Sequence, residues 1–214
     1  ELDVTDSGAL EAAQWSDYDT VINATAYINV DGAESTQGRR EAWSLNAHAV
    51  VHLARLAVEH DFTLVHVSTD YVFDGEQQVH STDEGFAPLN VYGQSKAAGE
   101  CAVAVVPRHF LVRTSWVVGD GPNFIRTMQS LAERGVDPEV VNDQIGLLTH
   151  AEDLARGIVE LLDSGQPFGT YHVTGDGEPQ SWYDIAQQAF SDAGYDPARV
   201  TPVSAEEYGR GKAL

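Results

Sequence analysis

Short apolar runs alternate along this chain with longer segments of helical periodicity. The apolar runs are rich in β-branched residues, which is typical of buried parallel strands. Strands are predicted at residues 19–24, 62–68, 109–114, 140–141 and 170–173. Helices are predicted where apolar residues recur every three or four positions, at residues 41–60, 91–106, 123–134, 151–162 and 181–193. The alternation predicts an α/β fold with a doubly wound, Rossmann-like parallel sheet.

Polar residues follow the predicted strands at the ends where parallel sheets bind ligands. Ser68 ends the second predicted strand and Thr69 directly follows it. Their hydroxyls can donate to a substrate carbonyl as charge builds on its oxygen. The alternative is that these hydroxyls only tie the strand end into a turn.

Small residues follow the first strand, in the run Asn23, Ala24, Thr25, Ala26 and Tyr27. They would let a flat cofactor approach the backbone, although simple packing of a helix on a strand would explain them too. Asn46 lies inside an apolar helical stretch. If this side chain is buried it needs hydrogen-bond partners, either a water in a helix kink or a neighbouring strand end; the alternative is solvent exposure.

Tyr92 and Lys96 are four residues apart and therefore one turn apart on a predicted helix. A nearby ammonium favours a phenolate, so we expect Lys96 to lower the pKa of Tyr92 from about 10. Tyr92 would then serve as a general acid or base. The pattern is short and common by chance, and only its position after Ser68 and Thr69 gives it weight.

Composition narrows the classes of partner. The 214 residues carry a formal net charge of −21, from 12 basic and 33 acidic residues. A field of this sign repels nucleic acid and anionic membranes. The acidic surface fits either adaptation to high salt or a genome rich in G and C. The sequence has two lysines, Lys96 and Lys212, and Lys96 belongs to the Tyr92–Lys96 motif.

Cysteine and histidine usage predicts neither disulfides nor a metal site. Cys101 is the single cysteine, which fits a reduced, cytoplasmic setting. The eight histidines, including His48 and His52 on one helix, form no spacing typical of metal ligands. No apolar run reaches the length of a membrane span and no signal peptide is visible. The opening at Glu1 without Met is expected of a piece of a longer protein.

Collinear motifs over residues 3–155 carry a resemblance to a known family. They are Asp3-Val-Thr-Asp6, Asn23-Ala-Thr-Ala-Tyr27, Val30-Asp-Gly-Ala-Glu34, Asn46, Ser68-Thr-Asp-Tyr-Val-Phe-Asp-Gly75, Pro88-Leu-Asn-Val-Tyr-Gly-Gln-Ser-Lys96, Arg113-Thr-Ser-Trp116, Asp143-Gln-Ile-Gly146 and Asp153-Leu-Ala155. Together they resemble the extended short-chain dehydrogenase/reductases, and within them the dTDP-4-dehydrorhamnose reductases.

The resemblance implies an enzyme that reduces the 4-keto group of dTDP-4-dehydro-L-rhamnose with hydride from NADPH or NADH. Tyr92 would protonate the C4 oxygen and Thr69 would polarise the carbonyl. Lys96 would hold the nicotinamide ribose and tune Tyr92. Arg113 would end its strand in an ion pair. Some relatives form homodimers and use Mg²⁺, but neither property maps onto residues of this sequence.

The resemblance also implies which residues bind the two small molecules. The cofactor would contact Asp3, Val4, Asn23, Ala24, Thr25, Ala26, Tyr27, Asn46, Ser68, Tyr92 and Lys96, with Asp3 and Val4 bordering the adenine. The nucleotide sugar would contact Asp70, Tyr71, Asn90 and Trp116; core packing is an equal alternative for Trp116. Residues 1–135 would form the cofactor and catalytic domain. Residues 136–214 would form mainly a substrate-binding lobe interleaved with it.

The sequence departs from the family pattern in several places. The glycine-rich phosphate loop and the family's first βαβ segment precede the start of this sequence, and a C-terminal segment is also missing. Ile28 stands where a small hydroxyl residue is usual, and Leu147-Leu148 stands where a small residue and Pro are usual. The polar tail after Gly194 is expected to be loosely held.

Two alternative functions stay open. One is a regulatory subunit without turnover, as in relatives that associate with methionine adenosyltransferase; retention of Tyr92 and Lys96 argues against it. The other is an extended-class nucleotide-sugar epimerase. A dehydratase is disfavoured because Asp70 is followed by Tyr71 rather than Glu.

Overall fold

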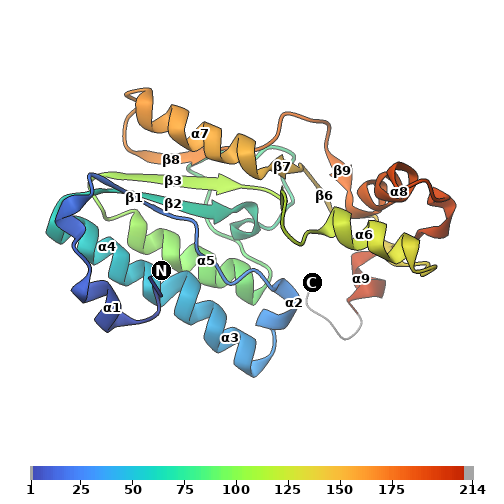
Figure 1. The fold of residues 1–214 in the computed structure, drawn as a ribbon, viewed down its shortest axis with the longest axis horizontal. Coiled ribbons are helices and arrows are strands. Elements are labelled where there is room, and N and C mark those ends of the chain that lie inside the picture. Colours follow the sequence, from blue (N-terminus) through green and yellow to red (C-terminus); the bar gives the residue numbers. More distant parts are fainter. Residues whose placement is uncertain (1, 210–214) are drawn as a thin grey trace. The chain divides into compact units, whose positions relative to one another are not determined.

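The structure is a computed structural model that describes residues 2–209 (Figure 1). Within the described residues the chain forms two compact units. The first unit comprises residues 2–114 and 161–173, and the second comprises residues 115–160 and 174–209. The chain therefore leaves the first unit at the end of a strand and returns to it once.

A four-stranded parallel sheet forms the centre of the first unit. Its strands are, in spatial order, β1 (Thr20–Asn23), β2 (Thr63–Thr69), β3 (His109–Thr114) and β8 (Gly169–His172). The register pairs Asn23 with His66 and Thr69 with Thr114. The carboxyl ends of β2 and β3 thus lie side by side, and the predicted parallel α/β sheet is confirmed.

Helices of the first unit lie on one side of this sheet (Figure 1). They are α1 (Ser7–Ala12), α2 (Val30–Ala33), α3 (Thr36–Trp43), α4 (Ala49–His60) and α5 (Val91–Val103). Of these, α4 and α5 pack directly on the sheet, because Leu53 of α4 and Val103 of α5 lie with Leu64 and Leu111 of the sheet in one buried cluster. At about 25 cal/mol per Å² of apolar surface, this burial is the main force that docks the helices.

The predicted helix at residues 41–60 belongs to a longer helical segment with an irregular turn. A π-helical turn, Ser44–His48, joins α3 to α4. Gly99 of α5 lies so close that a Cβ there would stand 2.2 Å from the carbonyl oxygen of Asn46. Hydrophobic periodicity cannot distinguish a π turn from an α turn, so the sequence did not predict it. Such turns often occur at functional sites.

The second unit is built from helices and short strand pairs. Its helices are α6 (Phe124–Glu133), the first ten residues of α7 (Ala151–Asp163), α8 (Trp182–Asp192) and α9 (Ala205–Tyr208). Its strand pairs are β4 (Val117–Val118) with β7 (Thr149–His150), β5 (Glu139–Val141) with β10 (Thr201–Val203), and β6 (Ile145–Gly146) with β9 (Gln180–Ser181). Met128, Ala186 and Phe190 lie in its buried core.

The expectation of a loosely held tail after Gly194 is wrong for the residues that the structure describes. β10 pairs in parallel with β5, and Arg199 reaches back to the carboxylate of Asp137. These contacts are more than 60 residues apart in the chain, so a local polar composition gave no sign of them. The part of this tail after Gly209 lies outside the described residues. None of the described helices is long and apolar enough to cross a membrane.

Candidate active site

The carboxyl end of β2 carries the first group of site residues. The Thr69 hydroxyl donates to Asp70 Oδ1 at 3.0 Å and accepts from the Tyr71 backbone N–H at 3.2 Å. Thr69 thereby caps a short 3₁₀ turn, Asp70–Val72. Burial raises the pKa of Asp70 to about 6, although the Thr69 hydrogen bond opposes this. The turn-tying role expected as an alternative for these hydroxyls therefore applies to Thr69.

The N-terminus of α5 brings Tyr92 to the same place. Asn90 Oδ1 accepts from the Gly93 N–H at 2.8 Å, and Glu34 Oε1 accepts from the Val91 N–H at 2.8 Å. These two acceptors satisfy backbone donors that the first turn of a helix leaves open. A Cβ at Gly93 would stand 2.2 Å from the Tyr71 carbonyl oxygen, so only glycine allows this close approach.

Tyr92 lies beside Thr69, at the end of β2, and Tyr71, in the turn that follows. Its phenol is close enough to the Thr69 hydroxyl for that hydroxyl to lower the pKa of Tyr92. Its ring lies edge-on to the Tyr71 ring, with centroids 5.6 Å apart. Burial raises the pKa of Tyr92 to about 12, and the Thr69 side chain acts in the opposite direction. The expected lowering by Lys96 is therefore wrong for this structure: removal of the phenol from water dominates, and Lys96 is not among the groups that shift this pKa.

Lys96 lies one turn further along α5 and is almost fully buried, at 1% exposure. Its ammonium Nζ donates to the Val67 carbonyl oxygen at 2.7 Å. Burial lowers the pKa of Lys96 to about 8, and the nearby Glu100 carboxylate opposes this shift. The ammonium is therefore held beside the β2 end, charged at neutral pH.

Two buried asparagines organise the backbone around this helix. Asn46, at 0% exposure, accepts from the Tyr27 N–H at 2.8 Å and donates to the Tyr27 carbonyl at 3.2 Å and Ser95 Oγ at 3.0 Å. Asn23 Nδ2 bonds His66 Nδ1 at 3.0 Å, while its Oδ1 accepts from the Thr25 hydroxyl at 2.7 Å. The partners of Asn46 are thus protein groups, and solvent exposure is excluded.

Three buried polar atoms near the strand ends have no hydrogen-bond partner within the described chain. They are Ser68 Oγ, Thr114 Oγ1 and His66 Nε2. A buried group without a partner costs about 1–3 kcal/mol. Ser68 and Thr114 stand at the carboxyl ends of neighbouring strands, where a bound ligand can supply the missing partner.

The remaining predicted cofactor residues lie at the start of the chain and after β1. The Asp3 carboxylate accepts from the Thr5 N–H and hydroxyl, which lowers its pKa. Val4 packs against the core beside α4. Ala24 and Thr25 are exposed and Ala26 is half-buried, so the backbone after β1 is open.

Trp116 belongs to the second unit and is described there by itself. Its ring stacks on Trp182 with centroids 3.8 Å apart, and its backbone φ is +31°. A positive φ is unusual for a bulky residue and marks a strained position. The packing role is present, and the substrate role stays a prediction.

Sequence reasoning missed several residues of this region. His66, Glu100 and the helix-capping role of Glu34 were not singled out. Glu34 closes the motif Val30–Glu34, and Glu100 lies four residues after Lys96, so spacing offered a signal for both. His66 offered none, because it reads as one more member of an apolar strand.

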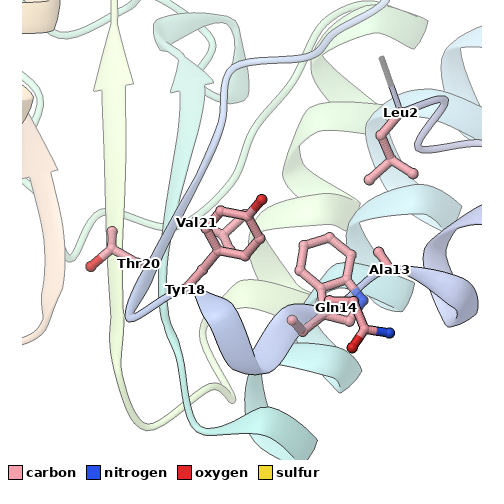
Figure 2. A pocket seen from close by; sticks show the side chains of 7 residues that line it. Leu2, Ala13, Gln14, Tyr18, Thr20 and Val21 are labelled. Carbon is pink, nitrogen blue, oxygen red and sulfur yellow. The ribbon is translucent and has the colours of Figure 1, made fainter.

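An open hollow of about 440 Å³ lies at the start of β1, lined by Leu2, Ala13, Gln14, Trp15, Tyr18, Thr20 and Val21 (Figure 2). None of the predicted catalytic residues lines it. Within the described part of the chain, no three His, Cys, Asp or Glu side chains gather in a way that could hold a metal ion. The catalytic role of Thr69, Tyr92 and Lys96 stays a prediction.

The parallel sheet and the Thr69–Tyr92–Lys96 arrangement define an extended short-chain dehydrogenase/reductase. The family model described as RmlD substrate binding domain matches residues 1–213, and the chain belongs to this family. A dTDP-4-dehydrorhamnose reductase from Mycobacterium tuberculosis is 41% identical, over 98% of this chain and 70% of its own length.

Two other proteins extend this relationship. A dTDP-4-keto-6-deoxy-D-glucose reductase from Streptomyces niveus is 37% identical, over 99% of this chain and 74% of its own length. The crystal structure of a Bacillus anthracis dTDP-4-dehydrorhamnose reductase in complex with NADP is 37% identical and superposes with a TM-score of 0.89. The match covers 100% of this chain and 75% of the B. anthracis chain.

Proposed function

We propose that this chain carries the catalytic residues of a nicotinamide-dependent reductase that converts dTDP-4-dehydro-L-rhamnose to dTDP-L-rhamnose. The proximity of the Tyr92 phenol to the Thr69 hydroxyl, with Lys96 one helical turn away, is the observation that carries the proposal. The names of the M. tuberculosis and B. anthracis relatives support the substrate.

Tyr92 acts as the general acid. Its raised pKa, about 12, keeps the phenol protonated at neutral pH, so it has a proton to give to the C4 oxygen. The Thr69 hydroxyl lies beside the phenol, and it can turn its proton from Asp70 to the same oxygen as negative charge develops there. Lys96 acts on the cofactor side, because it is not among the groups that shift the pKa of the phenol.

The residues present fit a nicotinamide cofactor, which supplies the hydride when bound. Lys96 uses one of its three N–H donors within the described chain, on Val67, and can direct the others to ribose hydroxyls. The buried Ser68 hydroxyl lacks a partner, and the backbone at Ala24 and Thr25 is open. The NADP complex of the B. anthracis relative supports NADPH over NADH.

The other assignments complete the proposal. Asp3, Val4, Asn23, Ala26, Tyr27 and Asn46 belong to the cofactor side, and Asp70, Tyr71, Asn90 and Trp116 belong to the substrate side. Residues 136–214 form mainly the substrate lobe. A cytoplasmic homodimer stays a prediction, and Mg²⁺ has no assigned residues.

The test is the oxidation of NADPH by the natural full-length protein on addition of dTDP-4-dehydro-L-rhamnose. Tyr92→Phe removes the proton donor, and we expect kcat to fall about 10²–10⁴-fold. Tyr18→Phe, at a position that is 59% exposed, is the matched control and should keep wild-type kcat. A folded wild type that binds NADPH but does not turn over would overturn the proposal and favour a regulatory subunit.

A second candidate substrate rests on the S. niveus relative, whose name specifies dTDP-4-keto-6-deoxy-D-glucose. The two sugars share the 4-keto group on which Tyr92 and Thr69 would act. Comparing kcat/KM for both sugars in one assay separates the candidates, because the true substrate should have the higher value.

A further inference from the structure

Arg113 and Glu100 form a buried ion pair next to the candidate site. Arg113 is the penultimate residue of β3, and Glu100 lies on α5 one turn after Lys96. Arg113 Nε and Nη2 donate to Glu100 Oε2 at 3.0 and 2.8 Å. The side chains are 6% and 1% exposed. Compared with apolar side chains of similar size, ion pairs this buried add little net stability. The presence of this pair therefore favours a role in positioning other residues.

The rest of the Arg113 guanidinium holds a long irregular segment, residues 73–89, which we call the connecting segment. Arg113 Nη1 donates to the Thr82 carbonyl at 3.2 Å. The guanidinium carbon lies 5.0 Å from the Phe73 ring centroid and 5.6 Å from that of Phe86. These contacts fall at the start, in the middle and near the end of the segment, so one side chain holds it at three points.

The connecting segment joins the two parts of the candidate site. It begins three residues after Asp70 and ends directly before Asn90, which caps the helix that carries Tyr92. The Ala87 N–H donates to the Val72 carbonyl at 2.9 Å and closes the base of the segment. Displacement of the segment would therefore move Thr69 and Tyr92 relative to each other.

We propose that Arg113 is a positioning residue of the reductase: it fixes the connecting segment on the catalytic helix and so sets the distance between Thr69 and Tyr92. This inference rests on the proposed function. Arg113 acts through the segment and through Glu100, and it has no assigned contact with substrate or cofactor. The planar guanidinium of arginine is essential, because it contacts a carboxylate, a backbone carbonyl and two aromatic rings at the same time.

The test is Arg113→Lys in the natural full-length protein. Lysine keeps the charge but cannot serve Glu100, Thr82 and the two rings together, so we expect kcat to fall about 10–100-fold. The Kd for NADPH should change less than about threefold, since no cofactor group is removed. Hydrogen exchange should become faster in residues 73–89.

Arg199→Lys is the matched control, because Arg199 in the second unit also lies over two rings and pairs with a carboxylate. It should lower Tm while leaving kcat within about twofold of wild type. Arg113→Lys with unchanged kcat, or with kcat and NADPH Kd damaged to the same degree, would overturn the proposal.

A second variant tests the same proposal if Arg113→Lys does not fold. We call the contacts of Arg113 with Phe73, Thr82 and Phe86 the clamp. Phe86 is 43% exposed, so Phe86→Leu removes one ring of the clamp and leaves the ion pair with Glu100 in place. We expect a smaller fall in kcat, about 3–10-fold, and an unchanged kcat would count against the clamp. If the wild type itself reduces neither sugar, the proposed function fails; faster exchange of residues 73–89 in the variants then supports the clamp, and unchanged exchange rejects it.

Discussion

Each of the two units contains an arginine that contacts two aromatic rings, a backbone carbonyl and a carboxylate. The two arginines and their carboxylate partners are buried to different degrees. Arg113 in the first unit lies over Phe73 and Phe86, and Arg199 in the second lies over Phe190 and Tyr195. Arg199 also bonds the carbonyls of Ala132 and Val136, much as Arg113 bonds that of Thr82. The arrangement of rings, carbonyl and carboxylate is therefore shared.

The carboxylate partners show the difference. Glu100 is 1% exposed beside Arg113, whereas Asp137 is 63% exposed beside Arg199. Water screens the second pair and can replace either partner, but it cannot reach the first. A buried pair is therefore intolerant of the loss of one member, which suits a device that fixes geometry. An exposed pair is suited to holding a surface turn.

The largest expected difference is in stability after removal of the charge. Arg113→Met leaves Glu100 buried without its partner and should lower the free energy of unfolding by about 3–5 kcal/mol. Arg199→Met should lower it by about 1 kcal/mol, since Asp137 remains hydrated. Urea unfolding of the two variants measures both values.

The double variant Arg113→Met with Glu100→Met serves as the control. It removes both charges and should be more stable than Arg113→Met alone. If Arg113→Met and Arg199→Met lower the free energy of unfolding by the same amount, burial of the carboxylate does not distinguish Arg113 from Arg199.

A smaller difference is expected for two asparagines. Asn46→Ala leaves buried groups of Tyr27 and Ser95 without partners and should lower the free energy of unfolding by about 2–3 kcal/mol. Asn123→Ala removes the N-cap of α6, nearer the surface, and should lower it by about 1 kcal/mol. Thermal or urea unfolding tests the order, and a larger loss for Asn123→Ala would contradict it.

The smallest expected effect is on pH dependence, where two aspartates differ in sign. Burial raises the pKa of Asp70 to about 6, so its contribution favours the folded state below about pH 4 and is lost as pH rises through 6. The Ser181 hydrogen bond lowers the pKa of Asp184, so its contribution is present above about pH 4 and is lost as pH falls. Carboxyl carbon NMR titration measures both midpoints; a midpoint near 4 for Asp70 would contradict the assignment of burial as the cause.

Much of the fold followed from periodicity. The strand at residues 109–114 was predicted to the residue, and Ser181 caps α8 as expected. Both features depend on local sequence, namely a β-branched apolar run and a capping residue. β10 and the π turn were missed because they depend on distant partners, Glu139–Val141 and Gly99.

The placement of the candidate residues along the chain was more predictable than their electrostatics, and their roles stay predictions. The spacing of Tyr92 and Lys96 and their position after Thr69 could be read from the chain. The direction of the Tyr92 pKa shift could not, because it depends on how deeply α5 buries the phenol. The hydrogen bond from Arg113 to Thr82 was also out of reach, since a backbone carbonyl has no sequence signature.

The π turn at Ser44–His48 gives the helical segment from α3 to α4 one residue more than a regular α-helix would hold over that stretch. Each residue advances an α-helix by about 100°, so a single deletion elsewhere in the segment would rotate Leu53 and Leu56 away from the sheet. A deletion inside the turn would let it close into an ordinary α turn and keep those residues facing inward. The turn therefore lets the chain hold one additional residue beside Asn46 while Leu53 and Leu56 keep facing the sheet.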